Sequence, residues 1–430
     1  MGMLRFLTSG ESHGPGLIAI IDGFPAGLTL DVEKVNQELL CRQQGYGRGA
    51  RQKIESDAAE FLGGLRHGLT SGGPLAVLIK NKDWDNWRHV MSVSPVDVSA
   101  SEVAEQLAKK AIERFRPGHA DLAGTLKFRQ QDIRDVLERA SARETAARVA
   151  VGAICQQLLG EFGVSMAAYV TQLGTVKTTQ TFENLRFAEL LSRIAESEMF
   201  CPDNDATEAM KELVKSAWQE GDSLGGVVEV QVEGLPVGLG SYTQWDSRID
   251  GQLAQALMSV QAIKAVEIGD GVKAASKPGS QVHDAIFPAS DESFVATLPF
   301  TRATNRAGGI EGGMTNGERV RVRAYMKPLP TLRKGLPSVS FPDFNADTAH
   351  YERSDVCAIS AASVVCKAMV AFVLARAFVD KFGGDSLTDM RLSFAAYQSY
   401  CHSLGSTSGS VASHKARTGT IEADTTAESE

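Results

Sequence analysis

Two histidines stand in short loops of small residues, where an imidazole can come close to a bound molecule. His13 lies in "SGESHGPG" (9–16) and His119 lies in "RPGHADLAG" (116–124). Glycine permits close approach of the backbone, and imidazole readily exchanges a proton near neutral pH. A purely structural histidine is the alternative at each position. Because both histidines have matching surroundings with arginines nearby, we interpret them as candidates for acid–base chemistry.

Positive charge gathers in two segments, although the chain carries a formal net charge of −8 at pH 7. The first segment contains no acidic residue, and its cations are Arg42, Arg48, Arg51 and Lys53, set among glycines. Guanidinium groups bind carboxylate and phosphate in a bidentate manner, so we favour an anion site over a solvated face here. The second segment runs from 319 to 334 and begins with "RVRVR". The strand period places Arg319, Arg321 and Arg323 on one face, and here we favour a solvated face or ion pairs between subunits.

Composition indicates a soluble globular protein, with 43% hydrophobic and 22% charged residues among 430. The net negative charge argues against nucleic acid or an anionic membrane as the main partner. The segment 357–379 comes closest to a membrane span, but Lys367 and Arg376 interrupt it. The six cysteines form no CxxC pair, so neither a disulfide framework nor a metal site is indicated. We therefore expect a cytoplasmic protein that acts on a small polyanion.

Three local motifs have competing interpretations. "GDSLG" (221–225) matches the G-x-S-x-G pattern of hydrolases, but we expect it to lead from a helix into a strand, the reverse of a nucleophile elbow. "GYGRG" (45–49) follows a helix and lacks the spacing of a dinucleotide loop. Asp355 in "ERSDVCAIS" precedes a long apolar segment, and its structural alternative is the N-cap of a helix. A polyanion-binding protein without catalysis is the non-enzymatic alternative.

Hydrophobic periodicity predicts the elements that must position these residues. We expect helices over 31–44, 99–115, 139–159, 206–220, 247–267 and 357–382. We expect strands over 17–27, 73–81, 166–176, 225–236, 291–300 and 318–328. Several strand pairs are joined by glycine turns, which favours antiparallel pairing in an α+β fold. Residues 403–430 are small and polar, and we expect a disordered tail after a single domain over 1–402.

Taken together, these segments resemble the chorismate synthase family. The stretches that carry the resemblance follow the family order over roughly residues 5 to 400, and they include "SGESHGPGL", "RPGHADLAGTLKF", "RASARETAARVAVGAI", "NRAGGIEGGMTNGERVRVRAYMKP" and "RSDVCAISAA". The resemblance implies a β-α-β sandwich, with a helical layer between antiparallel sheets, that assembles as a homotetramer. It implies a lyase that converts 5-enolpyruvylshikimate 3-phosphate into chorismate and phosphate by 1,4-anti elimination, the last step of the shikimate pathway. The reaction requires reduced FMN without net redox change. NADPH is expected only as an indirect electron source.

The resemblance also implies roles for individual residues. His13 is the implied proton donor to the leaving phosphate, and His119 holds a proton near the reduced flavin. Asp355 serves with flavin N5 in removing the C6 hydrogen, supported by Ser12 and Ser141. The implied substrate-binding residues are Arg42, Arg48, Arg51, Arg116, Arg143 and Arg353, with contact of Arg42 and Arg48 to a nicotinamide nucleotide left open. The implied flavin-binding residues are Arg139, Ala140, Ser141, Gln261, Ala262, Gly312, Lys327, Pro328, Leu329, Pro330, Thr331 and Arg353.

Overall fold

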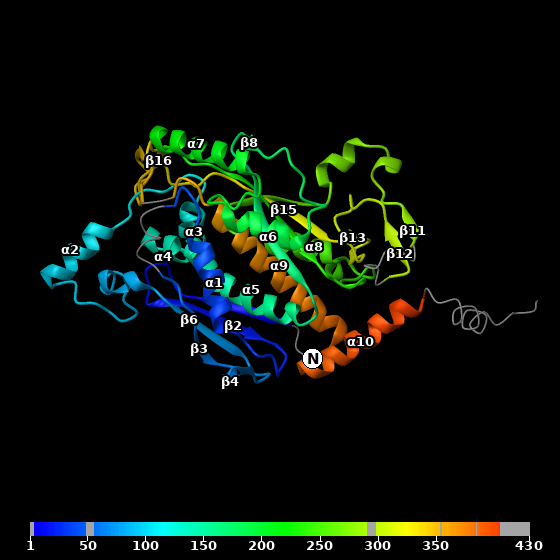
Figure 1. Cartoon of the computed structure of the whole chain (residues 1–430). Coiled ribbons are helices and arrows are strands. Elements are labelled where there is room, and N and C mark those ends of the chain that lie inside the picture. The colour runs from blue at the N-terminus through cyan, green and yellow to red at the C-terminus, as the bar shows by residue number, and fades with distance from the viewer. Residues whose placement is uncertain (1–3, 49–55, 290–297, 353–354, 384, 405–430) are drawn as a thin grey trace, which may run out of the picture.

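The computed structural model describes residues 4–48, 56–289, 298–352, 355–383 and 385–404, and two antiparallel sheets dominate it (Figure 1). Their strands are β1 (Arg5–Ser9), β2 (Gly16–Asp22), β3 (Glu60–Gly63), β6 (Leu75–Lys80), β7 (Ser165–Leu173), β8 (Val176–Lys177), β9 (Gly226–Glu233), β10 (Ile263–Ile268) and β15 (Val320–Met326). The first sheet has the order β1-β2-β6-β3 and the second β10-β15-β9-β7-β8. All neighbouring strands in both sheets are antiparallel, which confirms the predicted α+β class.

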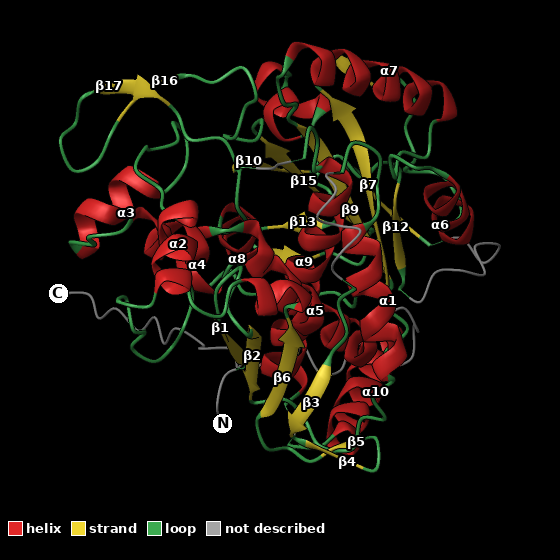
Figure 2. Cartoon of the chain, turned by 90° about the vertical axis from the view of Figure 1, so that its left-hand side faces the viewer, coloured by secondary structure: helices red, strands yellow, loops and turns green. Residues whose placement is uncertain are grey.

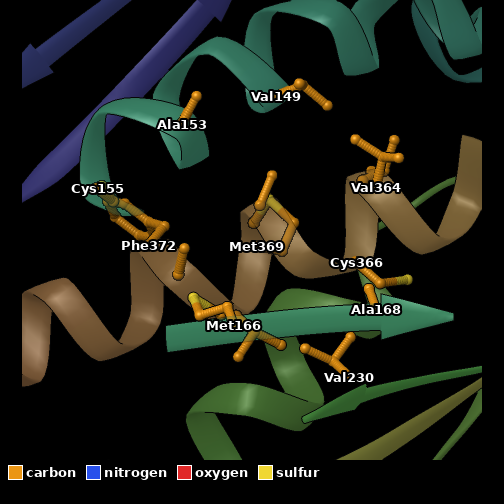
Figure 3. Packing of buried hydrophobic residues seen from close by; sticks show 14 of the residues in the cluster. Val149, Ala153, Cys155, Met166, Ala168, Val230, Val364, Cys366, Met369 and Phe372 are labelled. Atoms are coloured by element: carbon orange, nitrogen blue, oxygen red, sulfur yellow. The ribbon is translucent and has the colours of Figure 1, made fainter. Parts of the chain in front are cut away.

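A layer of helices lies between the two sheets, as the sandwich prediction requires (Figure 2). Its members are α1 (Val32–Gln43), α5 (Thr145–Gly160) and α9 (Ile359–Phe382). Helix α5 packs on β2 of the first sheet, α9 packs on β7 and β9 of the second, and the two helices pack on each other. Figure 3 shows Val149 and Ala153 of α5 on one side of α9, with Met166 of β7 and Val230 of β9 on the other.

Helix α9 is the centre of the core because it is apolar on every face. Among the described residues it is the one helix long and apolar enough to cross a membrane, and 83% of its most apolar window is buried inside the protein. The contact with α5 is close at Gly152. A Cβ atom added there would lie 2.3 Å from the Cα of Ala368. The absence of a side chain at this position therefore sets the distance between the two helices.

Shorter elements surround the sandwich. The helices are α2 (Ser101–Lys110), α3 (Asp121–Phe128), α4 (Ile133–Ala140), α6 (Phe187–Glu196), α7 (Asn204–Glu220), α8 (Ile249–Met258) and α10 (Leu387–Ser403). The two-stranded pairs are β4 (Leu65–Arg66) with β5 (Leu69–Thr70), β11 (Ile286–Pro288) with β12 (Phe300–Arg302), β13 (Ile310–Glu311) with β14 (Met314–Thr315), and β16 (Pro337–Val339) with β17 (Ala346–Thr348). A small second core joins α4 to the loop after α2 and to the β16 segment. This core holds the loop that carries His119.

Three predicted helices differ from the structure, and the strand expected over 17–27 ends at Asp22. The helix expected over 247–267 is wrong beyond Met258, because its second half is strand β10 at the edge of the second sheet. The helix expected over 139–159 is interrupted at Ser141, whose side chain accepts a hydrogen bond from the N–H of Arg143 before α5 begins. The helix expected over 99–115 ends at Lys110. The strand expected over 291–300 and the tail after 404 lie mostly outside the described residues, and the 1–402 domain boundary stays a prediction.

Candidate active site

A cavity of about 980 Å³ opens at one end of the helical layer, at the upper limit of the range for small-molecule sites. Its walls come from segments far apart in the sequence. They are the end of α1 with the loop to Arg48, residues 118–120 before α3, residues 140–145 between α4 and α5, the last turns of α7, the loop after α8, the end of β15 and the start of α9. The fold therefore gathers most of the segments that the sequence analysis selected.

Two of the predicted anion-binding arginines meet on one buried carboxylate. Arg42 and Arg143 line the cavity, and Asp57 binds a terminal nitrogen of each, at 2.7 Å and 2.6 Å. Burial opposes ionisation of Asp57, but the two guanidinium groups outweigh it and lower the pKa of the carboxyl. Burial also lowers the pKa of Arg42. The Nε atom of Arg42 is buried and has no hydrogen-bond partner among the described residues.

A second arginine–carboxylate pair also lines the cavity. Arg48 lies 2.9 Å from Asp355, and both residues line the cavity. The N-cap alternative for Asp355 is wrong, because α9 begins at Ile359 and the residue at its N-cap is Ala358. Of the other predicted arginines, Arg51 and Arg353 lie outside the described residues.

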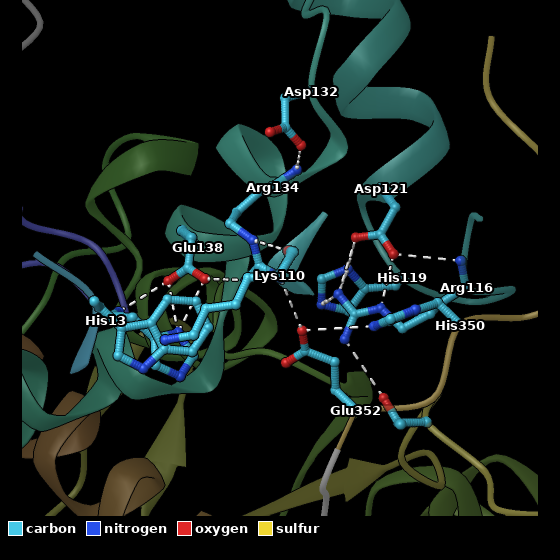
Figure 4. Close-up of polar contacts among 12 residues, drawn as sticks. His13, Lys110, Arg116, His119, Asp121, Asp132, Arg134, Glu138, His350 and Glu352 are labelled. Carbon is cyan, nitrogen blue, oxygen red and sulfur yellow. Dashed lines mark hydrogen bonds and ion pairs between the residues drawn. The ribbon is translucent and has the colours of Figure 1, made fainter. Parts of the chain in front are cut away.

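His119 lines the cavity and belongs to a buried polar group (Figure 4). Its Nδ1 lies 2.5 Å from Asp121, which is fully buried. Arg116 also binds Asp121, at 2.7 Å through Nε and at 3.0 Å through a terminal nitrogen. Burial opposes ionisation of Asp121, but His119 and Arg116 lower its pKa. Lys327 donates a hydrogen bond to the carbonyl of Gly118 and fixes the same loop from the β15 side.

His13 is buried and does not belong to the cavity lining. Its Nδ1 lies 2.9 Å from both carboxylate oxygens of Glu138 on α4. The ring of Trp87 stacks on the imidazole with a centroid distance of 3.8 Å. The hydroxyl groups of Ser12 and Ser141 lie 3.1 Å apart. Since Ser141 lines the cavity, this contact joins the His13 loop to the cavity wall.

Most of the predicted flavin-binding residues come together. Ala140, Ser141, Gln261, Ala262, Lys327, Leu329 and Pro330 line the cavity. Arg139 instead donates hydrogen bonds to the carbonyls of Thr8 and Gly10, and Pro328, Thr331 and Gly312 are not lining residues. Gly312 lies in the β13–β14 turn.

Two features of this wall fit a cofactor with polar groups along its edge. The Oε1 atom of Gln261 is buried without a hydrogen-bond partner among the described residues. Ala262 adopts a φ of 67°, a region that L-residues other than glycine rarely occupy. Strained backbone of this kind concentrates at ligand sites. Among the described residues, no group of His, Cys, Asp and Glu could hold a metal ion.

The segments 221–225 and 319–323 both have structural roles. "GDSLG" ends α7 at Gly221 and leads into strand β9, and Ser223 donates a hydrogen bond to the carbonyl of Leu329, so the hydrolase interpretation is wrong. "RVRVR" is likewise no anion site. Its three arginines pair with carboxylates of the same chain, Arg319 with Glu233, Arg321 with Glu183 and Arg323 with Glu229.

Sequence reasoning missed the carboxylates that hold the site together. Asp57, Asp121 and Glu138 are each buried and each contact a predicted functional residue. Asp121 stands two residues after His119, so the "HAD" spacing was an available signal. Glu138 is 125 residues from His13, and no spacing rule connects the two. Trp87 and Trp218, an exposed lining residue at the end of α7, were also not selected.

Comparison with known proteins agrees with this arrangement. The model of a family described as chorismate synthase matches residues 4–379. The chain is 50% identical over 398 residues to a chorismate synthase of Desulforamulus reducens, which covers 93% of this chain and 99% of that protein. It is 50% identical over 402 residues to one of Moorella thermoacetica, covering 94% and 100%. A solved structure described as a crystal structure of chorismate synthase is similar with a TM-score of 0.74 and 39% identity, covering 94% of this chain and 99% of that one.

Proposed function

The chain belongs to the chorismate synthase family, and we propose that it converts 5-enolpyruvylshikimate 3-phosphate into chorismate and phosphate by 1,4-anti elimination. The observation that carries the proposal is the cavity that brings His119, three arginines and the predicted flavin-binding segments together. A substrate with two carboxylates and a phosphate needs several cations to hold it. Arg42, Arg48 and Arg143 supply them from the walls of this cavity.

Reduced FMN would be held by residues 140–141, 261–262, 327 and 329–330, all of which line the cavity. When bound, reduced FMN supplies the electron chemistry of the elimination and ends the cycle unchanged. The protein orients the reactants and excludes water and oxygen. The apolar side chains at the start of α9, from Ala358 to Val365, provide the water-excluding wall. We expect reduced FMN from an outside source, with NADPH only as an indirect donor.

The acid–base roles are those that the family resemblance implies, and the chemistry of the leaving group agrees with them. Departure of phosphate is helped by a proton and by cationic groups at the oxygen that gains charge. We assign His13 as the proton donor and His119 as the group that holds a proton near the flavin. Asp355 assists flavin N5 in removing the C6 hydrogen, and its 2.9 Å contact with Arg48 orients the carboxylate. Ser12 and Ser141, whose hydroxyl groups lie 3.1 Å apart, support Asp355 in this step. The sites of Arg51 and Arg353 lie outside the described residues and stay predictions.

Assembly as a homotetramer is part of the proposal, and the outer face of the first sheet supports it. Leu7, Ile18, Ile20 and Leu62 are exposed, Leu7 by 73% and Leu62 by 58%. Leu7 pairs with Ile20 in the sheet register, so the apolar side chains are neighbours. Contiguous apolar patches on a soluble protein typically mark interfaces, and a flat sheet face suits a two-fold contact between copies. Light scattering should give a tetramer, and an Ile20→Lys variant should give a smaller species.

We also propose a cytoplasmic location. All six cysteines are free in the structure, and four of them are buried. Free thiols without disulfides are typical of a reducing compartment.

The experiment that tests the proposed function is an assay of phosphate release with and without reduced FMN. We expect release from 5-enolpyruvylshikimate 3-phosphate only when reduced FMN is present. Equal release with flavin absent would contradict the assignment. Tight binding of the substrate without any turnover under reducing conditions would favour the polyanion-binding alternative instead.

A further inference from the structure

Both candidate acid–base histidines are held in the same way by a buried carboxylate. His13 Nδ1 lies 2.9 Å from the carboxylate of Glu138, and the backbone N–H of His13 donates to the same group at 2.8 Å. The Glu138 side chain has no exposed surface. Arg134, one turn earlier on α4, donates to Glu138 at 2.9 Å. The unit is therefore a chain from histidine to carboxylate to arginine.

The same chain recurs around the second histidine, built from unrelated segments. His119 Nδ1 lies 2.5 Å from Asp121, whose side chain is also fully buried, and Arg116 binds the other side of Asp121. A terminal nitrogen of Arg116 also lies 3.0 Å from His119 Nδ1. Arg116 can only donate, so an Nδ1–H of His119 cannot form a hydrogen bond with it. The contact with Asp121 is shorter and its acceptor is charged, so it is the stronger of the two. We therefore assign the Nδ1 proton of His119 to the bond with Asp121.

A third carboxylate lies between the two units (Figure 4). Glu352 is 3.5 Å from Arg134 and 3.7 Å from His350. Burial opposes its ionisation, but His350, Arg134, Arg116 and His13 together lower the pKa of Glu352 to about 2. The carboxylates of Glu138, Glu352 and Asp121 thus alternate with the guanidinium groups of Arg134 and Arg116 through the cluster. This alternation keeps both histidine-binding carboxylates ionised and confines them to accepting hydrogen bonds.

The position of the proton on a neutral imidazole is set by the partner of its other nitrogen. An ionised carboxylate can only accept, so Nδ1 must carry the proton and Nε2 is left with its lone pair. The ring of Trp87 stacks on one face of the His13 imidazole. Among the described residues, His13 Nε2 has no hydrogen-bond partner.

We propose that Glu138 and Asp121 are positioning residues that fix the orientation of His13 and His119 with Nδ1–H toward the carboxylate. Nε2 of each ring is then the nitrogen that takes up a proton to form the imidazolium and gives that proton to the reacting molecules. This inference rests on the proposed function, which identifies the reaction in which the two histidines take part. It adds that each histidine works as part of a histidine–carboxylate–arginine unit. It also explains why Trp87, which lies outside the cavity lining, and Glu138 of α4 both contact His13.

The purely structural alternative is that Glu138 and Asp121 serve only as partners for Arg134 and Arg116. That role concerns stability, because removing one member of a buried ion pair leaves an unpaired charge. It predicts a loss of stability with an unchanged turnover rate per folded molecule. The positioning role predicts a loss of kcat that remains after correction for the folded fraction.

The test uses the isosteric variants Glu138→Gln and Asp121→Asn in the full-length protein with reduced FMN. An amide has one acceptor oxygen where the carboxylate has two, so an NH2 group faces the imidazole or the arginine. In a comparable unit, replacing the carboxylate with an amide gives the wrong tautomer and lowers kcat by about 10⁴. We expect kcat to fall by about 10² to 10⁴ with little change in KM or in reduced-FMN affinity. The matched control is Glu38→Gln, which breaks a 2.6 Å pair with Lys367 outside the cavity.

A second readout does not depend on turnover or on the folding of the two amide variants. Solid-state NMR of protein labelled with [¹⁵N]histidine distinguishes the two neutral tautomers at alkaline pH, and His13→Gln and His119→Gln assign the signals. We expect the proton on Nδ1 of both residues in the wild type. A proton on Nε2 of either residue would overturn the proposal for that residue. Wild-type kcat in both amide variants would overturn it as well, while chorismate formation by the wild type would leave the proposed function standing.

Discussion

Asp57 is the residue whose removal should damage the site most through electrostatics alone. Its side chain has no exposed surface, and it separates two guanidinium groups that are themselves almost fully buried. The change Asp57→Asn keeps the shape of the side chain and removes the charge. Arg42 and Arg143 then repel each other, and that repulsion already contributes to the lowered pKa of Arg42. The amide can accept from only one of them.

The expected loss of stability follows from the burial of the group. Breaking a buried ion pair by removing one partner costs about 3–5 kcal/mol. A typical protein has an unfolding free energy of about 5–15 kcal/mol, so the variant should lose a large share of its stability. The control is Asp22→Asn. This carboxylate pairs with Arg5 at 3.0 Å on the surface, where both side chains are well exposed, and such pairs contribute about 0–1 kcal/mol.

The pH dependence has a defined sign. The folded-state pKa of Asp57 lies below its ordinary value, which is about 3.9 in an unfolded chain. Its ionisation therefore stabilises the fold fully above about pH 5, and this contribution is lost as the pH falls through the folded pKa. The difference in stability between wild type and Asp57→Asn should be constant from about pH 6 to 8 and should narrow below about pH 4.

Urea unfolding followed by circular dichroism measures both effects. We expect the free energy of unfolding of Asp57→Asn to fall by at least about 3 kcal/mol at neutral pH. A loss no larger than that of Asp22→Asn would refute the reasoning. A difference that grows in acid would also refute it, because the sign of the linkage would then be reversed.

Three further variants test separate parts of the account. In His119→Ala, kcat should fall by about 10² to 10⁴ with a smaller effect on substrate affinity, and steady-state kinetics showing an unchanged maximal rate would exclude the acid–base role. Gly152→Ala should lower the unfolding free energy by about 1–3 kcal/mol, since overpacking against Ala368 outweighs the gain of about 1 kcal/mol in helix propensity; a more stable protein would contradict this. Ser223→Ala should retain chorismate formation and lose about 1 kcal/mol of stability from one hydrogen bond to Leu329, so abolished turnover would reopen the nucleophile question.

The fold was predictable where a single segment determines its own structure. Helix α9 and strands β7, β9 and β15 follow from continuous or alternating apolar residues, and the structure has them close to the predicted bounds. The segment 247–267 was not predictable in this way. Its apolar spacing suits a helix throughout, yet the second half pairs with β15 at a sheet edge. The pairing with β15 therefore selects a strand over a helix for residues 263–268.

The candidate site was predictable in its histidines and arginines and not in the groups that hold them. His119 and Arg42 stand in unusual local settings that indicate chemistry. Glu138 stands in an ordinary amphipathic helix and reaches His13 across 125 positions. Asp57 is likewise 86 positions from Arg143. Such partners are fixed by the packing of distant elements, which local composition does not encode.

The measurement that tests the central claim most directly is an anaerobic turnover assay with purified protein, dithionite-reduced FMN and 5-enolpyruvylshikimate 3-phosphate. Chorismate, phosphate and the redox state of the flavin are followed together. The account predicts chorismate and phosphate in equal amounts, with the flavin still reduced when the substrate is exhausted. Phosphate without chorismate, or oxidation of one flavin for each product formed, would contradict it.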